Sequence, residues 1–161
     1  MNRASSSIAA VAAAVGLAVI AGCGGGGSAP VDDTPEGQAF LFRNAVMTIV
    51  ASKMKTLSDM ARNEIPADDA VFTKAANDLA ALAGMATEGF MPQGIPDGSR
   101  AAPEIWDDWS DFERRAQSFQ DAAEAVADAA NNGGVEAARE LVRPLAQTCG
   151  GCHNTYRAPE E

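Results

Sequence analysis

Apolar residues recur at every third or fourth position in four separate stretches of the chain, which is the spacing of helices with one buried face. The spacing predicts helices over residues 35–62, 67–86, 103–131 and 135–157. No segment alternates apolar and polar residues in the manner of a half-buried strand, so we predict an all-α fold. The expected buried positions are, in chain order, Met47, Val50, Met54, Leu57, Ala61, Val71, Ala75, Leu79, Leu82, Ala86, Ile105, Trp109, Phe112, Ala116, Phe119, Ala123, Val126, Ala130, Ala138, Val142, Leu145, Cys149, Cys152 and Tyr156.

The residues between these stretches favour helix ends and turns. Thr34 or Asp33 can cap the first helix, and the Asn-Gly-Gly sequence at 132–134 should end the third. Residues 89–103 form a longer connection whose prolines and glycines exclude regular structure. Pro144 lies inside the fourth helix and should either kink it or displace one of its hydrogen bonds. Four amphipathic helices with mostly short connections favour an antiparallel, left-handed up-down-up-down four-helix bundle.

The first 22 residues predict a lipoprotein-type export signal. Arg3 precedes an uncharged apolar run over residues 8–21 that is too short to span a bilayer comfortably. The run ends in Ile-Ala-Gly-Cys at 20–23, which resembles the bacterial lipobox, in which the cysteine is lipidated. A membrane anchor helix, and ordinary cleavage that leaves Cys23 as a free thiol, are the alternatives.

Residues 23–34 are rich in Gly and end in acidic residues, which predicts a flexible linker. Residues 35–161 are then the folded domain. We expect a periplasmic protein, held on a membrane surface by acyl chains on Cys23 if the lipobox is used.

The charge of the chain restricts its partners. The sequence has 22 Asp and Glu against 12 Lys and Arg, which gives a formal net charge of −10. This excludes nucleic-acid binding, because contact with phosphates needs a basic face. An acidic surface favours partner proteins with basic surfaces, and salt should weaken their association.

The residues best suited to chemistry lie near the C-terminus. Cys149 and Cys152 are followed by His153, the only histidine in the chain. C-x-x-C-H is the attachment sequence of a c-type haem. Residues three and four apart share one face of a helix, so both sulfurs can reach the haem vinyl groups while the imidazole points at the iron. We infer one haem c, covalently bound through Cys149 and Cys152, with His153 as an axial iron ligand.

Three other uses of a C-x-x-C pair fit this chain less well. A redox dithiol is expected beside a βαβ pattern, which the sequence lacks. A zinc site needs four ligands, and two cysteines with one histidine supply three. A disulfide across so short a loop on a helix has poor geometry.

Three short stretches carry a resemblance to a known family. Residues 42–47 (FRNAVM), 100–106 (RAAPEIW) and 152–157 (CHNTYR) are similar to motifs of the class II cytochromes c, the cytochrome c′ family. The resemblance spans about residues 38–157. It implies a four-helix bundle with haem near the C-terminal end of the last helix, attached outside the cytoplasm. Family members often form dimers through the first two helices, so a homodimer remains open.

The group on the other side of the iron decides the function. If the first and fourth helices are antiparallel, the haem lies beside the N-terminal half of the first, where Met47 falls on the expected buried stripe. Met54 and Met60 lie about 10 and 20 Å further along, too far to bind the same iron. Geometry leaves Met85 and Met91 open. In the family, the slot of Met47 holds Leu or Phe in five-coordinate members and Met in low-spin members. Packing in the core is the other role open to Met47.

Two arginines can pair with the haem propionates, because a guanidinium matches a carboxylate in a fork. Arg43 lies one turn before Met47, and Arg157 lies one turn after His153. A solvated charge at the helix end is the alternative role of Arg157.

We therefore expect an exported monohaem electron carrier in which His153 and Met47 bind the iron. No base, nucleophile or second metal site accompanies the motif, so we expect no enzymatic activity. The alternative is a cytochrome c′ with five-coordinate iron that binds small neutral gases such as NO and CO.

Overall fold

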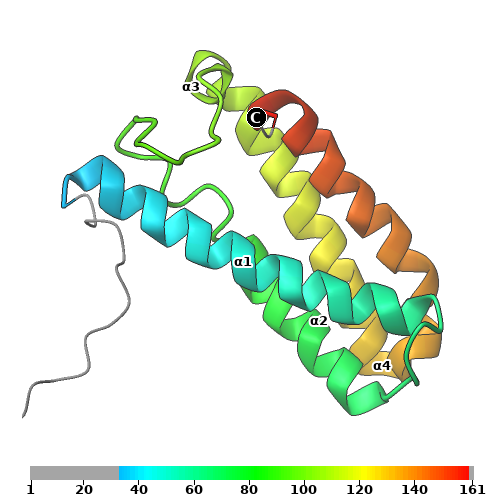
Figure 1. Cartoon of the computed structure of the whole chain (residues 1–161). Coiled ribbons are helices and arrows are strands. Elements are labelled where there is room, and N and C mark those ends of the chain that lie inside the picture. Colours follow the sequence, from blue (N-terminus) through cyan, green and yellow to red (C-terminus); the bar gives the residue numbers. More distant parts are fainter. Residues whose placement is uncertain (1–32, 160–161) are drawn as a thin grey trace, which may run out of the picture. The chain divides into compact units, whose positions relative to one another are not determined.

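A computed structural model describes residues 33–159 of the chain (Figure 1). The elements are α1 (Pro35–Ala61), α2 (Asp69–Ala83), the short α3 (Glu104–Asp107) and α4 (Trp109–Tyr156). The described residues contain no strand, and Ala101 and Arg157 form one isolated antiparallel bridge. The all-α prediction is confirmed. The predicted export signal, Cys23 and nearly all of the linker lie outside the described residues. None of the helices in residues 33–159 has the length and apolar character needed to cross a membrane.

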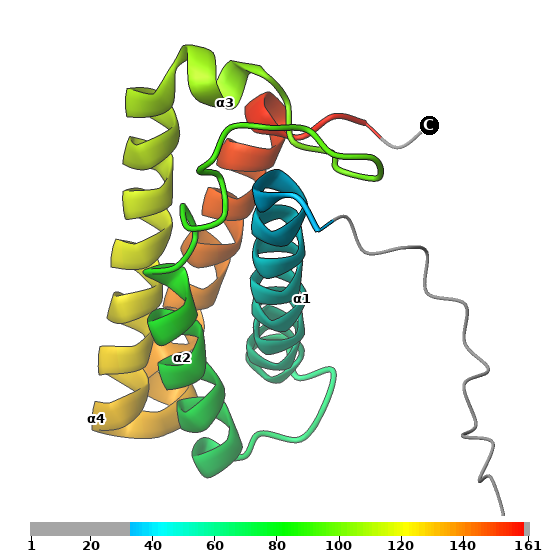
Figure 2. The same cartoon turned by 90° about the vertical axis from the view of Figure 1, so that its left-hand side faces the viewer.

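α4 contributes two of the four helices of the bundle. Its backbone leaves helical geometry at Gly133 (φ −165°, ψ 27°) and Gly134 (φ 62°, ψ −150°). The chain reverses there, so residues 109–132 and residues 135–156 run antiparallel to each other (Figure 2). We call these the first and second runs of α4. Together with α1 and α2 they form the predicted up-down-up-down bundle, and the predicted stop at 132–134 is confirmed.

The expected seam of the third helix is interrupted at Asp108. Asp108 has φ −131° and ψ 62°, and its side chain accepts a hydrogen bond from the Asp111 N–H at 3.2 Å. An aspartate in this position competes with the helical backbone and caps a new helix, which separates α3 from α4. The prediction of one helix over 103–131 is therefore wrong at this point. Ile105 is still buried, whereas Trp109 is only partly buried.

The buried face of α2 departs from the prediction at its first position, whereas Ala75, Leu79 and Ala86 are buried as predicted. Val71, expected in the core, keeps 48% of its surface exposed, while its neighbour Phe72 is fully buried. The phenyl ring removes more apolar area from water than the valine side chain, so it takes the inward position. Asp68 caps α2 by accepting from the Val71 N–H at 3.0 Å, so the helix begins later than residue 67.

The core lies mainly between α2 and the two runs of α4, and α1 packs against one side of it. Its most completely buried large side chains are Leu57, Phe72, Leu79, Val126 and Leu145. A smaller cluster at the other end joins Phe90 of the loop to Ile105, Phe112 and Tyr156.

The reversal within α4 is fixed to α2 by Asp69. The Val135 N–H donates to Asp69 Oδ1 at 2.9 Å, which caps the second run of α4 with a side chain from another helix. Gly134 has a left-handed φ of 62°, and a Cβ placed there would collide with the Asp69 carboxylate. Only glycine fits this position without displacing the cap.

We expect Gly134→Ala to lower the free energy of unfolding by about 2–4 kcal/mol, because it adds left-handed strain and removes the cap. Urea unfolding followed by circular dichroism would measure the change. Gly98→Ala is the matched control, since Gly98 has φ 80° but nothing lies within 4 Å of the place that a Cβ would take there. It should cost only the backbone strain, about 1–2 kcal/mol. Equal losses in both variants would contradict a role for the Asp69 contact.

Candidate functional site

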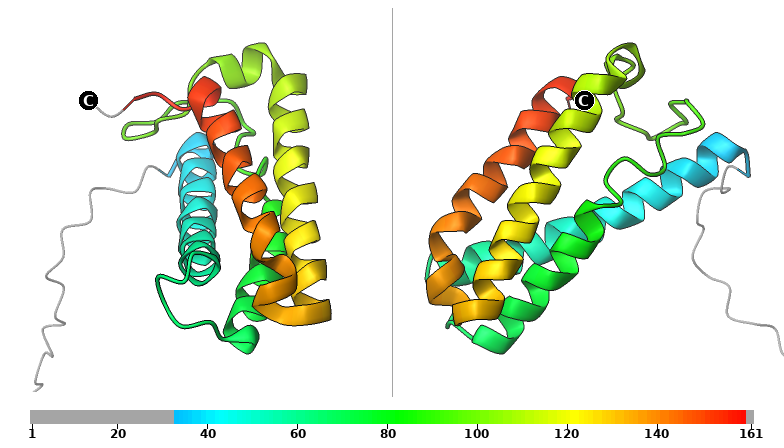
Figure 3. Two further views of the ribbon diagram at one scale, coloured as in Figure 1. Left: turned by 90° about the vertical axis from the view of Figure 1, so that its right-hand side faces the viewer. Right: turned by 180° about the vertical axis from the view of Figure 1, so that it is seen from behind.

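An open cavity of about 920 Å³ lies between α1 and the second run of α4. The N-terminal end of α1 diverges from the C-terminal end of α4, as the rear view in Figure 3 shows. Cys149, Cys152 and His153 line the cavity from α4, and Arg43 and Met47 line it from α1. The structure therefore brings every site residue predicted from the sequence, Arg157 included, to one cavity.

The two cysteines of the motif are half-buried and free of disulfide bonds. Burial raises the pKa of both thiols, and for Cys152 the nearby Arg115 opposes part of this rise. A raised pKa keeps the thiolate scarce, whereas reactive redox cysteines have a lowered pKa. This environment disfavours the dithiol alternative, and both cysteines belong to the cavity lining.

His153 lies exposed at the edge of the cavity. Partial burial of its ring lowers its pKa, and the charges of Arg157 and Arg100 lower it further. The neutral imidazole, which is the form that binds a metal, is therefore favoured. Within residues 33–159, no three His, Cys, Asp or Glu side chains are grouped so as to hold a metal ion without a cofactor.

The methionines divide between the cavity and the surface. Met47 is partly buried, packs against the main core and lines the cavity, as does Met54 about two turns later. Met60 is buried in the core. Met85 and Met91, which the sequence left open as ligands, keep 39% and 59% of their surfaces exposed and are not part of the cavity lining.

Arg43 is almost completely buried, although it is charged. Its Nη1 donates to the Gly89 carbonyl at 2.8 Å and its Nη2 donates to Ser99 Oγ at 2.8 Å. The guanidinium carbon lies 5.1 and 5.2 Å from the ring centres of Phe40 and Phe90. Burial lowers its pKa. These partners are neutral, so the cation at the cavity wall is complementary to an anionic group of a ligand.

Arg157 lies at the end of α4, where the helix meets the loop before α3. Its backbone N–H donates to the His153 carbonyl at 3.2 Å, and its side chain is exposed at the cavity. The neighbouring Ala102 N–H donates to the Tyr156 carbonyl at 3.1 Å. The loop of residues 89–103 therefore joins the Arg43 region of α1 to the end of α4.

Aromatic side chains form one wall of the cavity. The ring of Phe112 lies 4.9 Å from that of Phe90 and 5.4 Å from that of Tyr156, edge to face in both cases. An apolar wall with guanidinium groups at its margins suits a large, flat, apolar molecule that carries carboxylates, which describes haem. The volume also fits, because ligand cavities typically measure roughly 300–1,000 Å³.

Sequence reasoning missed a group of polar contacts next to the motif. Asp111 accepts hydrogen bonds from Arg115 Nε at 2.5 Å and from the Tyr156 hydroxyl at 2.7 Å, and Arg114 also pairs with it. Arg115 further donates to the Gly151 carbonyl inside the motif. The i,i+4 spacing of Asp111 and Arg115 was visible in the sequence, but the contact with Gly151, 36 residues away, was not.

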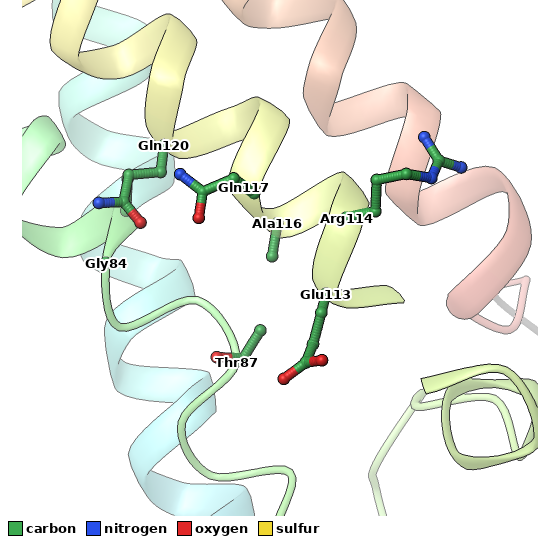
Figure 4. A pocket seen from close by; sticks show the side chains of 8 residues that line it. Gly84, Thr87, Glu113, Arg114, Ala116, Gln117 and Gln120 are labelled. Carbon is green, nitrogen blue, oxygen red and sulfur yellow. The ribbon is translucent and has the colours of Figure 1, made fainter. Parts of the chain in front are cut away.

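A second, smaller pocket of about 370 Å³ lies between the end of α2 and the first run of α4 (Figure 4). Its polar lining is formed mainly by Thr87, Glu113, Gln117 and Gln120. It contains no Cys or His, so the chemistry of the motif belongs to the larger cavity.

Comparison with known proteins identifies the family. A family profile described as Cytochrome C′ matches residues 38–157. The chain belongs to the cytochrome c′ family. Members carry one covalently bound haem c, and this cytochrome has both attachment cysteines, Cys149 and Cys152.

Individual relatives agree in sequence and fold. Cytochrome c-554 of Cereibacter sphaeroides is 35% identical over 119 residues, covering 71% of this chain and 77% of the relative. The solved cytochrome c prime of Shewanella frigidimarina superposes with a TM-score of 0.73 at 29% identity, covering 80% of this chain and 99% of the other. The nitric oxide complex of a mutant cytochrome c prime from Alcaligenes xylosoxidans gives 0.71 at 27% identity, with coverages of 80% and 99%.

We expect replacement of both attachment cysteines, Cys149→Ser with Cys152→Ser, to abolish covalent haem, because no thioether can then form. A denaturing gel stained for haem peroxidase activity would check this. Met91→Ala, which changes an exposed residue outside the cavity, should stain as strongly as the wild type. A stained band from the double variant would contradict attachment at these two residues.

We also expect the stability of the protein to depend on the charge of Asp111. The hydrogen bonds from Arg115 and Tyr156 lower the pKa of Asp111 to about 2 from an ordinary 3.8. A lowered folded-state pKa stabilises the fold fully above the ordinary pKa, and this contribution is lost as the pH falls towards 2. Asp111→Asn should therefore lower the thermal midpoint at pH 7.

The difference in midpoint between wild type and Asp111→Asn should shrink as the pH falls from about 4 to about 2. Thermal unfolding across this range measures it. Asp121→Asn is the control, because the side chain of the exposed Asp121 pairs with the neutral Gln117. Its difference in midpoint from the wild type should change less over the same pH range. A pH-independent difference for Asp111→Asn would contradict the proposed stabilisation of its ionised form.

Proposed function

We propose that this protein is an exported monohaem cytochrome c′ that binds a small neutral gas such as NO or CO at the haem. The observation that supports this best is the course of the cavity, which extends from the C-x-x-C-H turn of α4 to the wall that Met47, Val50 and Met54 form on α1. A haem held from α4 would leave one side towards that wall. Variants of the related cytochrome c prime from Alcaligenes xylosoxidans are solved with bound nitric oxide and with bound carbon monoxide.

In this proposal His153 binds the iron from the α4 side, and Cys149 and Cys152 hold the macrocycle covalently. The haem iron would supply the site at which the gas binds. Arg43 and Arg157 would pair with the propionates, because both line the cavity and Arg43 has only neutral hydrogen-bond partners. Met47, Val50 and Phe119 would bound the space on the other side and exclude water from it.

A second candidate function is electron transfer, and Met47 is the observation that favours it. Its thioether belongs to a partly buried side chain of the cavity lining. If the sulfur bound the iron opposite His153, it would close the gas site and raise the reduction potential. Haem with His and Met ligands suits the transfer of single electrons.

The cellular setting is part of the same proposal. The export signal predicted over residues 1–22 would place the protein in the periplasm, with a membrane anchor if Cys23 is lipidated. The net charge of −10 favours redox partners with basic surfaces, and the proposal includes association as a homodimer, which the family resemblance implies. We propose no catalytic role, because the cysteines and the histidine of the cavity lining would be used to hold the haem.

The optical spectrum of Met47→Ala distinguishes the two functions. For a gas-binding cytochrome we expect a high-spin spectrum in the native protein, unchanged in form by Met47→Ala, with tighter CO binding because the methionine no longer fills the space. For an electron carrier, a low-spin native spectrum should become high-spin in this variant. Met54→Ala is the control and should leave the spectrum unchanged. A low-spin native spectrum would contradict the gas-binding proposal.

A further inference from the structure

The motif contains a local weakness, since its two central residues are both glycine. Gly150 and Gly151 lie within the second run of α4 and separate the two cysteines. Glycine is among the poorest helix formers, because its backbone loses the most freedom on ordering. Nothing lies within 4 Å of the position that a Cβ would take at either residue. No packing at the two glycines therefore holds this turn, although it must keep Cys149, Cys152 and His153 on one face, and only Cys152 packs against the aromatic cluster.

Arg115, from the first run of α4, reaches this turn. Its Nη1 donates to the carbonyl oxygen of Gly151. A guanidinium bond to a carbonyl is charge-assisted and stronger than a neutral hydrogen bond. The contact joins residues 36 positions apart and connects the two runs of α4 at the motif itself.

Arg115 is itself held in place from two sides. Its Nε donates to Asp111 Oδ2 at 2.5 Å, and its guanidinium carbon lies 5.7 Å from the centre of the Tyr156 ring. The Tyr156 hydroxyl donates to the same Asp111 oxygen at 2.7 Å. Tyr156 is buried and lies one turn after Cys152. The two runs of α4 are thus joined by contacts that connect to one another. Arg115 contacts Gly151 and Tyr156 of the second run, and Asp111 binds both Arg115 and Tyr156.

We propose that Arg115 is a positioning residue for the haem, which fixes the Cys149–His153 turn by binding the Gly151 carbonyl while Asp111 and Tyr156 orient its guanidinium. Arg115 keeps the two sulfurs and the imidazole in one arrangement in a turn that two glycines would otherwise leave mobile. It also lines the cavity beside Cys152. The proposal rests on haem attachment at this motif, and it applies whichever group lies on the other side of the iron.

Arg114 provides a matched control. It carries the same charge and also pairs with Asp111, but its side chain is 66% exposed and has no contact with Gly151 in the described structure. Figure 4 shows its side chain extending from the first run of α4 away from Glu113 and Thr87. Replacing Arg114 therefore removes an equal charge, on a neighbouring residue, without removing the contact that the proposal requires.

Two measurements on the intact holoprotein test the proposal. The first is hydrogen–deuterium exchange of the backbone amides of residues 149–156. In Arg115→Met we expect exchange there to accelerate about tenfold, because a charge-assisted hydrogen bond that opposes opening is lost. In Arg114→Met we expect less than about a twofold change. Unchanged exchange in Arg115→Met, or equal acceleration in both variants, would overturn the proposal.

The second measurement is the midpoint reduction potential, which responds to the environment of the axial imidazole. We expect it to shift in Arg115→Met and to stay unchanged in Arg114→Met. Gly151→Ala can be added to Arg115→Met, since alanine stiffens the helix and its methyl group meets no protein atom. The double variant should return both exchange and potential towards wild type.

If the double variant restores exchange but leaves the potential shifted, the charge of Arg115 and not the geometry of the turn changes the potential, and the role of Arg115 in positioning the imidazole is refuted. Should Arg115→Met fail to accumulate, Arg115→Lys serves in its place, because one ammonium cannot copy the fork that joins Asp111 to Gly151. A low-spin native spectrum would remove the gas-binding proposal and leave this comparison of exchange rates intact. The two proposals can therefore fail separately.

Discussion

The reversal of α4 at Gly133 and Gly134 is the constraint on which the site depends. As one straight helix, residues 109–149 would extend about 60 Å and would carry Cys149 far from Phe112. The reversal instead returns the motif to the end of the bundle where α4 begins and where α1 also begins (Figure 2). Two features fix the reversal at this point. The Asp69 carboxylate caps the second run by accepting from the Val135 N–H, and it occupies the space that a Cβ at Gly134 would take.

Much of the fold follows from local patterns that a sequence displays. Apolar spacing locates the helices, and the Asn-Gly-Gly sequence locates the reversal. The C-x-x-C-H motif identifies the ligand because its spacing alone brings the reactive groups to one helix face. The pattern fails where two local signals compete. At Val71 and Phe72, both apolar, the larger side chain is buried, and at Asp108 a capping carboxylate interrupts a regular apolar seam.

The contacts that complete the site join residues far apart in the chain, which explains why the sequence did not predict them. Arg43 is a clear example. It was identified because it lies in a stretch that resembles a family motif, but its hydrogen bonds to Gly89 and Ser99 depend on the path of the loop. Arg115 is another, because its partner in the motif is brought near only by the reversal. The spacing of apolar residues predicts which face of a helix is buried. The hydrogen-bond partners of Arg43 and Arg115 depend instead on how the helices and the loop pack against each other.

The divergence of α1 from the second run of α4 has a mechanical consequence. α1 packs against α4 less extensively than α2 does, and the cavity lies between α1 and the second run of α4. A cofactor bound in the cavity must therefore supply the apolar contacts that a neighbouring helix supplies elsewhere in the bundle. A bound cofactor would then restrict the motion of the N-terminal end of α1. It would act as a structural component of the part of the bundle that surrounds the cavity.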